Sequence, residues 1–284
     1  MKRQETESGT IGKLYVVGSP IGNLGDFSPR AVETLKTVDF ICAEDTRVTA
    51  VLLAKFDIKK PMISYHEHNA RQRGQEILPR LLEGGSCAVI TDAGMPCISD
   101  PGEELVKLCA EHGIEVAAVP GPTAAMTALA ISGLPTKRFC FEGFLSTTKR
   151  IRREHLEQLK PLPQTLIFYE APHKLKNTLN DLLEILGDRR ISLCREITKL
   201  HEEVQRGTIS QMAALYEEKE PRGEYVLVVE GAGEERAEEL TLQQAADLAR
   251  ELTEQGMKPS EASKEAAKRS GYSKSEIYRE LQNT

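Results

Sequence analysis

The chain has 284 residues, of which 40% are hydrophobic, and a formal net charge of -6. This length can bury substantial cores and indicates two domains with a small appendage. No apolar run reaches the roughly 18–20 residues needed to cross a bilayer, and the polar N-terminus lacks the apolar core of a signal peptide. The negative charge excludes indiscriminate binding to polyanions, so contacts with nucleic acid must come from local basic patches.

The cysteine pattern favours a reducing compartment. The six cysteines are scattered, with no CxxC pair and no structural zinc pattern. Most sit in apolar stretches, as expected of reduced, buried thiols in a cytoplasmic protein. The His-x-His at 66–68 has no third ligand nearby, so we expect no bound metal. This polar segment can instead be a solvated loop or contribute contacts to a substrate.

The first half of the chain alternates strand and helix signals. Apolar runs predict strands at 14–17, 40–43, 87–90 and 116–119. Ser28 and Pro29 cap a helix that runs to about Lys36, and a further helix at 123–131 is stopped by Gly133. Near-continuous apolar strands that alternate with helices predict a parallel sheet.

The segment 87–101, CAVITDAGMPCISDP, is the strongest candidate for a ligand site in the first half. Its strand breaks at Asp92 into a loop of small residues. Asp100 then reads as the N-cap of a helix, with Pro101 in the first turn and Glu103 in the capping-box position. Open α/β sheets place ligands at such strand ends, where Asp92 can accept hydrogen bonds. The alternative is an ordinary strand-to-helix connection.

The pattern changes at 136–163, where KR at 137–138 and KRIRR at 149–153 are followed by two prolines. We interpret this stretch as an inter-domain connection. A second α/β unit follows, with strands at 165–169, 191–194 and 225–229 and a helix at 175–186. Residues 231–239 are acidic and typical of a linker.

Three short helices are predicted in the last forty-odd residues. The first two cover 242–255 and 259–269, and Ser273 with Glu276 forms a capping box for the third. Glycines at the turns make the group resemble a helix-turn-helix. A small packing bundle or a dimerisation cap explains the same pattern.

Two loops of the first half carry further candidate chemistry. The loop at 18–25, GSPIGNLG, lacks GxGxxG spacing, and Pro20 removes an amide donor, so a small molecule other than a dinucleotide is favoured. Glu44, Asp45 and Arg47 follow a strand, where they can orient a substrate, neutralise charge or remove a proton. Asp45 can equally cap the next helix, whereas the Arg47 guanidinium suits phosphate or ribose contacts.

Seven segments together identify a known family. They are GSPIGNLGD at 18–26, EDTR at 44–47, TDAGMPCISDPG at 91–102, PGPTAA at 120–125, FCFEGFL at 139–145, FYEA at 168–171 and EYVLVVEG at 224–231. They resemble the ribosomal RNA small subunit methyltransferase I family, which belongs to the class III, tetrapyrrole-methylase-like group of S-adenosylmethionine enzymes. The resemblance runs from about Gly12 to the end of the chain and is looser in the helical tail.

The resemblance implies a fold, a cofactor and a substrate. It implies two α/β domains of the tetrapyrrole-methylase type, at 12–135 and 136–233, with S-adenosylmethionine in the cleft between them. A small helical domain follows at 240–284. It also implies a metal-independent homodimer that methylates the ribose 2′-hydroxyl of a cytidine in the decoding region of 16S ribosomal RNA, in the small ribosomal subunit.

The resemblance also assigns roles to individual residues. Glu44, Asp45 and Arg47 are expected on the substrate side as catalytic residues, with the general base left open between the two acids. The expected cofactor contacts are Pro20, Asp92, Met95, Thr123, Ala124, Tyr169 and Glu224. The chain departs from the family pattern at Lys174, which follows His173 where an arginine is expected, and this puts a bidentate phosphate contact there in doubt.

Two basic surfaces are predicted to bind the RNA. One is the run at 149–153, with Lys149, Arg150, Arg152 and Arg153, and the other is in the tail, where helical spacing places Lys264 and Lys268 on one face. A tetrapyrrole C-methyltransferase shares the fold and cofactor but has no evident need for these surfaces. A ribosome-binding module without catalysis is the other alternative, against which the intact EDTR and DAGMP segments count.

Overall fold

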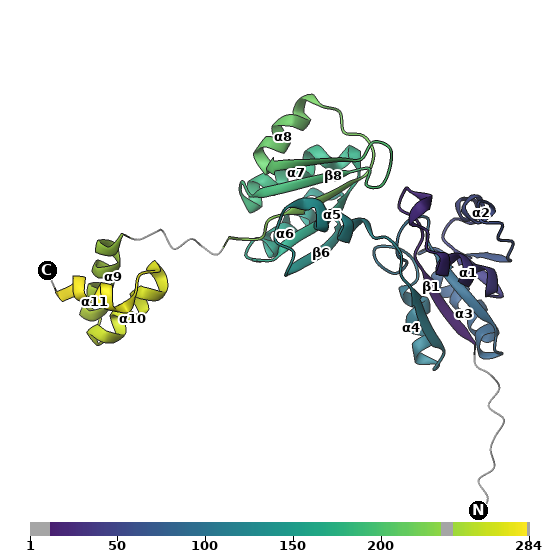
Figure 1. Cartoon of the computed structure of the whole chain (residues 1–284), viewed down its shortest axis with the longest axis horizontal. Coiled ribbons are helices and arrows are strands. Elements are labelled where there is room, and N and C mark those ends of the chain that lie inside the picture. The colour runs from purple at the N-terminus through teal and green to yellow at the C-terminus, as the bar shows by residue number, and fades with distance from the viewer. Residues whose placement is uncertain (1–11, 234–240, 283–284) are drawn as a thin grey trace, which may run out of the picture. The chain divides into compact units, whose positions relative to one another are not determined.

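A five-stranded parallel sheet forms the first part of the protein (Figure 1). Its strands lie in the order β3-β2-β4-β1-β5, so β1 pairs with both β4 and β5. The strands are β1 (Lys13–Val17), β2 (Phe40–Ala43), β3 (Met62–Ser64), β4 (Ser86–Ile90) and β5 (Glu115–Val119). The connecting helices are α1 (Pro29–Thr37), α2 (Thr46–Ala54), α3 (Ala70–Leu82) and α4 (Glu103–Glu111), with a short 3-10 turn at Leu24–Asp26.

The three inner strands β1, β2 and β4 are largely buried on both faces, as the sequence pattern predicts, whereas most of the edge strand β5 is exposed or partly buried. One face packs Leu14, Cys42 and Val89 against α3 and α4. The other face packs Val17 and Ile41 against α1 and α2. The parallel arrangement is therefore confirmed, and two-sided burial explains why the strands are apolar without alternation.

A second five-stranded sheet is mixed and lies in the order β6-β7-β10-β8-β9. Only β6 and β7 run parallel, and the other neighbours are antiparallel. Its strands are β6 (Phe139–Phe144), β7 (Thr165–Glu170), β8 (Arg190–Arg195), β9 (Glu203–Thr208) and β10 (Tyr225–Val229). The helices of this part are α5 (Ala124–Ser132), α6 (Lys149–Leu159), α7 (Pro172–Leu186) and α8 (Ile209–Glu218).

The interpretation of 136–163 as an inter-domain connection was wrong. This stretch contributes the edge strand β6 and the helix α6. A register shift between Phe141 and Gly143 interrupts the pairing of β6 with β7. Because of this shift, the apolar and polar residues of β6 do not alternate regularly in the sequence. α6 is rich in charged residues and buries only Arg152, Leu156 and Leu159, so its sequence looks like that of a solvated segment.

The helix α5 packs on the second sheet, although it directly follows the last strand of the first. Ala125, Ala128 and Leu129 share a hydrophobic core with residues of β7, β8 and β10. Ile21, from the loop after β1, belongs to the same core. A residue from a loop of the first sheet therefore packs with the core of the second sheet, inside one compact unit.

The structure is a computed structural model and describes residues 12–233 and 241–282. Within them, 12–159 and 164–230 form one compact unit, and 160–163 with 231–233 and 241–282 form a second. Most of the predicted linker at 231–239 lies outside the described residues.

The second unit contains the three helices α9 (Leu242–Glu254), α10 (Pro259–Ser270) and α11 (Lys274–Gln282). The predicted helices are confirmed, as is the capping box at Ser273, whose hydroxyl accepts the backbone N–H of Glu276 while the Glu276 carboxylate accepts the backbone N–H of Ser273. The helices pack around alanines and Ile277, which lets their backbones approach closely.

Candidate functional site

Backbone hydrogen bonds join two loops at the carboxyl edge of the first sheet. The Ser19 N–H donates to the Gly94 carbonyl at 2.8 Å, and the Gly94 N–H donates to the Ser19 carbonyl at 3.2 Å. The buried Ser19 hydroxyl adds a bond to the Thr91 carbonyl at 3.0 Å. The loop after β1 and the loop after β4 are therefore fixed to each other.

Two glycines hold the loop after β5 against the loop after β1. A Cβ on Gly121 would lie 2.9 Å from backbone carbons of Gly18, and a Cβ on Gly18 would lie 2.7 Å from Gly121. The Gly121 N–H also donates to Met95 Sδ at 3.3 Å. Only glycine permits this backbone contact, which brings the three loops together.

The loop after β4 takes an unusual path before α4 begins. Cys97 and Ser99 have φ of 73° and 60°, values that L-residues other than glycine seldom adopt. The N-cap of α4 is Gly102, with no side-chain capping bond, so the predicted capping role of Asp100 was wrong. Instead, Asp100 lines a cavity.

This cavity has a volume of about 720 Å³, in the range of small-molecule sites. Its wall comes from the loops after β1 and β4, the start of α5, and strands and loops of the second sheet. The lining residues are Ile21, Ala93, Gly94, Met95, Ile98, Ser99, Asp100, Thr123, Ala124, Ala125, Met126, Phe141, Phe144, Tyr169, Glu170, Ala171, Pro172, Cys194, Glu196, Ile197, Lys199, Glu224, Tyr225 and Val226.

An aromatic cluster forms one side of the cavity. The ring centroids of Phe141 and Tyr169 are 5.0 Å apart, and those of Phe144 and Tyr169 are 5.4 Å apart. The Tyr169 hydroxyl accepts the backbone N–H of Ala125 at 3.2 Å, which fixes the ring at the start of α5. Phe144 remains 57% exposed, so it offers an open aromatic face.

The charged residues of the cavity are mostly acidic. Lys199 supplies the positive charge among the lining residues, and its Nζ lies 3.0 Å from Glu196 and 2.9 Å from Glu224. Asp100 has no ion-pair partner among the described residues. Burial raises the pKa of Asp100 to about 7, and the nearby charges of Glu44 and Asp92 act in the same direction.

Most of the cofactor contacts expected from the sequence lie at this cavity. Met95, Thr123, Ala124, Tyr169 and Glu224 line it. Pro20 and Asp92 do not, although their neighbours Ile21 and Ala93 do.

The residues expected to be catalytic form a hydrogen-bonded group with Asp92 instead of lining the cavity. The Asp92 N–H donates to Glu44 Oε2 at 3.2 Å, and the Asp45 N–H donates to Asp92 Oδ1 at 3.3 Å. Burial raises the pKa of Glu44. Hydrogen bonds from Arg47 hold the pKa of Asp45 well below its usual range, which makes Asp45 a weak proton acceptor.

The basic run on α6 is largely neutralised by acidic neighbours. Arg152 is buried, and its Nη2 lies 2.6 Å from Asp181 Oδ2. Arg153 pairs with Asp181 and Glu184, and Arg150 pairs with Glu154. The structure thus gives Arg152 a role inside the fold, because its guanidinium has no accessible face for a phosphate. Lys149 is exposed, as are Lys264 and Lys268 on α10.

Two broader properties concern only the part of the chain that the structure describes. No group of three or more His, Cys, Asp or Glu side chains there is arranged to hold a metal ion. Among the described helices, none has the length and apolar character needed to cross a membrane.

Sequence reasoning missed three features of the cavity: Asp100, Lys199 and the exposed face of Phe144. Asp100 was not recognised as a cavity residue because its sequence position, directly before Pro101, resembles a helix cap. Lys199 lies in the loop between β8 and the unpredicted strand β9. A signal for Phe144 was present in the FCFEGFL segment, whose phenylalanines recur in a strand-like stretch.

Comparison with known proteins shows the class of enzyme to which the fold belongs. The family of tetrapyrrole (corrin/porphyrin) methylases matches residues 13–213. Solved structures share the fold: a uroporphyrin-III C-methyltransferase from Thermus thermophilus, at 23% identity, has a TM-score of 0.53 over 76% of this chain and 94% of that one. A cobalt precorrin-4 methyltransferase, at 19% identity, has a TM-score of 0.56 over 76% of this chain and 94% of that one. The two α/β sheets are therefore those of the tetrapyrrole methylases.

Within that class, the chain belongs to the ribosomal RNA small subunit methyltransferase I family. The Synechocystis member is 48% identical over 94% of this chain and 96% of its own length. The Bacillus subtilis member is 44% identical over 99% of this chain and 97% of its own length. The Halalkalibacterium halodurans member is 52% identical over 78% of this chain and 77% of its own length.

Proposed function

We propose that this chain transfers the methyl group of S-adenosylmethionine to the ribose 2′-hydroxyl of a cytidine in small-subunit ribosomal RNA. The observation that carries the proposal is the cavity at the carboxyl edge of the first sheet, where five expected cofactor residues meet Asp100. Membership of the family supports the substrate and the cofactor.

The cavity suits S-adenosylmethionine in size and in charge. Its volume of about 720 Å³ fits a ligand of this size. Asp100 lacks a cationic partner among the described residues, and such a carboxylate attracts a ligand with positively charged groups. The backbone amides at Thr123 and Ala124, at the start of α5, suit a carboxylate, and the aromatic cluster offers apolar contact.

The bound cofactor supplies an activated methyl group, so the protein must position the hydroxyl and accept its proton. Of the acids considered, Asp100 fits that second role best, because it lines the cavity and its pKa lies near 7. Glu44 is half-buried beside Asp92 and supports the negative field around Asp100. Asp45 instead holds the exposed Arg47 guanidinium, to which we assign contacts with the RNA.

Incubation with methyl-labelled cofactor tests the function directly. Purified protein is given either small ribosomal subunits or a precorrin, and label in the ribose of a cytidine is expected only with the subunits. Label only in the tetrapyrrole would make the chain a C-methyltransferase. Binding to subunits without transfer would make it a ribosome-binding module.

The finer points of assembly and location remain proposals on the same basis. We propose a homodimer in the cytoplasm, as the family resemblance implies. Sedimentation of the full chain at micromolar concentration tests the dimer, and fractionation of cells tests the location.

A further inference from the structure

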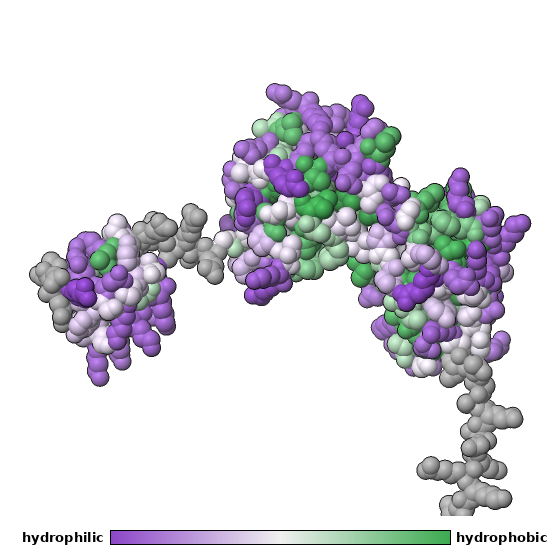
Figure 2. All heavy atoms as spheres, viewed as in Figure 1, coloured by the Kyte–Doolittle hydropathy of each residue, from purple (hydrophilic) through white to green (hydrophobic). Residues whose placement is uncertain are grey.

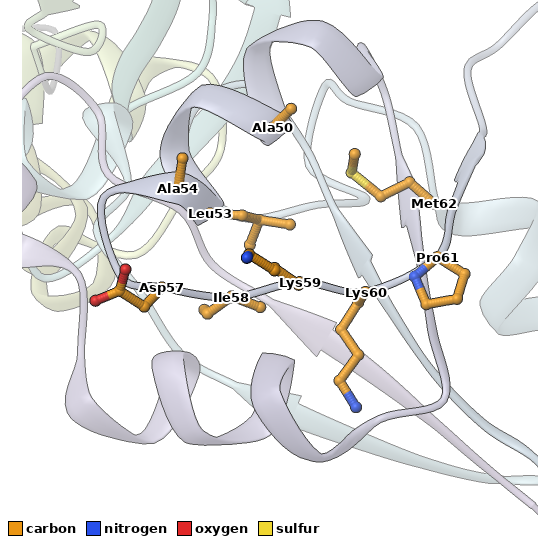
Figure 3. A pocket seen from close by; sticks show the side chains of 9 residues that line it. All are labelled: Ala50, Leu53, Ala54, Asp57, Ile58, Lys59, Lys60, Pro61 and Met62. Carbon is orange, nitrogen blue, oxygen red and sulfur yellow. The ribbon is translucent and has the colours of Figure 1, made fainter.

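A second hollow lies beside the C-terminal half of α2 and the segment that leads into β3 (Figure 3). We call it the α2 groove. Its volume is about 480 Å³, within the range of sites for small ligands. The lining residues are Ala50, Leu53, Ala54, Asp57, Ile58, Lys59, Lys60, Pro61 and Met62.

The floor of the α2 groove is apolar. Leu53 and Ile58 are buried at its base, with Met62 partly buried beside them. Figure 3 shows Leu53 reaching from the helix toward Met62, with the short side chains of Ala50 and Ala54 on the same helix. Small residues on α2 leave room for a flat group to lie against this floor.

The rim of the α2 groove is basic in a chain that is acidic overall. Its charged lining residues are two lysines, Lys59 and Lys60, and one acid, Asp57, whereas the whole chain has a net charge of -6. Lys55, Lys59 and Lys60 form no ion pair with any described residue, although Asp39 lies near Lys60. This distinguishes the groove from α6, where three of the four cations are held by acids.

We propose that the α2 groove holds one unstacked nucleotide of the RNA substrate, with its base on the apolar floor and a neighbouring phosphate at Lys59 and Lys60. The proposal rests on the proposed function, because it takes the RNA as substrate. Unstacked bases bind to apolar platforms, and lysines bind the backbone phosphates. Asp57 can accept a hydrogen bond from an exocyclic amino group of that base.

The position of the groove along α2 supports this occupant. Arg47 lies in the first turn of α2, and the helix residues that line the groove run from Ala50 to Ala54, about 5 to 10 Å further along the helix axis. Val48 and Val51 lie on the same helix, one on each side of Ala50 in the sequence, and are 46% and 64% exposed. Figure 2 shows hydrophobic side chains gathered on the surface in the region where α2 lies in the same view. One RNA strand can therefore contact Arg47, the exposed valines and the groove in succession.

Two variants of the full chain test the groove by charge and by shape. Lys59→Gln with Lys60→Gln removes the two rim charges. Lys36→Gln with Lys107→Gln is the matched control, since it removes two exposed lysines from α1 and α4 and changes the net charge equally. Ala50→Leu with Ala54→Leu fills the groove from two exposed helix positions without changing charge.

Binding to small ribosomal subunits is measured over a series of salt concentrations. The Lys59/Lys60 variant should bind roughly tenfold or more weakly at 0.1 M salt, with a salt slope shallower by about 0.7, because the contact to one phosphate is lost. The filled variant should bind more weakly with an unchanged slope. Both should retain the cofactor affinity of the unmodified protein in calorimetry.

Two results would overturn the proposal. One is a Lys59/Lys60 variant that behaves like the Lys36/Lys107 control, and the other is a filled variant with unaltered RNA affinity. If sedimentation of that filled variant also shows a changed oligomeric state, the groove is assigned to a second copy of the chain. Failure of the unmodified protein to methylate subunits would instead reject the proposed function.

Discussion

The Asp45 carboxylate holds the Arg47 guanidinium through two side-chain hydrogen bonds, Nε to Oδ1 at 3.0 Å and Nη2 to Oδ2 at 2.6 Å. The backbone N–H of Arg47 donates to the same carboxylate at 2.8 Å. The Arg47 side chain is 89% exposed, so the orientation of its guanidinium depends on this contact. Asp45 therefore presents Arg47 to solvent in a fixed direction, as the recognition of a phosphate or ribose requires.

Asp45→Asn should lower the rate of methyl transfer about a hundredfold, because it frees the guanidinium while an amide oxygen can still cap α2. Arg47→Ala should have a similar effect, and the double variant should be little worse than either. Cofactor affinity should be unaltered in all three. Additive losses in the double variant would show that the two residues act independently.

Asp100→Asn should reduce methyl transfer by about 10²- to 10⁴-fold and abolish its pH dependence near neutrality. The unmodified enzyme should gain activity as the pH rises through about 7, because the carboxylate must be ionised to accept a proton. Rate measurements from pH 5 to 9 check this. An Asp100→Asn enzyme that keeps the same pH profile would exclude Asp100 as the base.

The same substitution should affect stability in a pH-dependent way. The pKa of Asp100 is raised in the folded state, so the folded protein binds more protons than the unfolded chain between about pH 4 and 7. Stability of the unmodified protein therefore falls across that window. In thermal melts, the melting temperature of Asp100→Asn should rise relative to that of the unmodified protein between pH 4 and 7. Above pH 7 the difference between the two melting temperatures should stay constant.

Arg152→Met should destabilise the protein, because the buried Asp181 carboxylate loses its closest cation and keeps only Arg153, at 3.2 Å. The loss should stay below the roughly 3–5 kcal/mol that a buried charge costs when it has no partner left. Arg152→Met with Asp181→Leu should recover most of that loss. Urea unfolding measures both, with Arg150→Gln as the control for an exposed pair, where a change of less than about 1 kcal/mol is expected. If Arg152→Met leaves the stability unchanged but weakens RNA binding, Arg152 contacts RNA, as the sequence predicts.

Gly121→Ala should weaken cofactor binding, because its Cβ would force the loops after β1 and β5 apart. Overpacking of this kind costs about 1–3 kcal/mol in stability. Gly233→Ala is the matched control, since a Cβ there would have no atom of the described residues within 4 Å. Calorimetric titration with the cofactor checks the effect, and equal affinities would show that the glycine contact does not shape the site.

The sequence predicts those strands well that are apolar throughout and buried along their whole length. The strands β2 and β10 have the predicted bounds, because each is an uninterrupted apolar run buried along its whole length. β3 was not predicted, since its three residues are only partly buried. β9 was missed for a similar reason: none of its residues is fully buried, and charged side chains interrupt it.

The site was harder to predict than the fold. Motif resemblance pointed to Met95, Thr123 and Tyr169, which line the cavity. It could not reveal that Arg152 is neutralised, because its partner Asp181 comes from another helix 29 residues further along the chain. The role of Asp100 was hidden for a local reason, since an Asp-Pro pair before a helix commonly marks a cap.

The strand order of the second sheet has a consequence for biosynthesis. β10 is its central strand, paired on both sides, yet it is the last strand to be synthesised. Until residue 229 has left the ribosome, β7 and β8 each present an unpaired edge, and α5 lacks part of the surface on which it packs. The first sheet has all its strands after residue 119, so nascent chains should acquire protease resistance in two stages, the second only after β10 emerges.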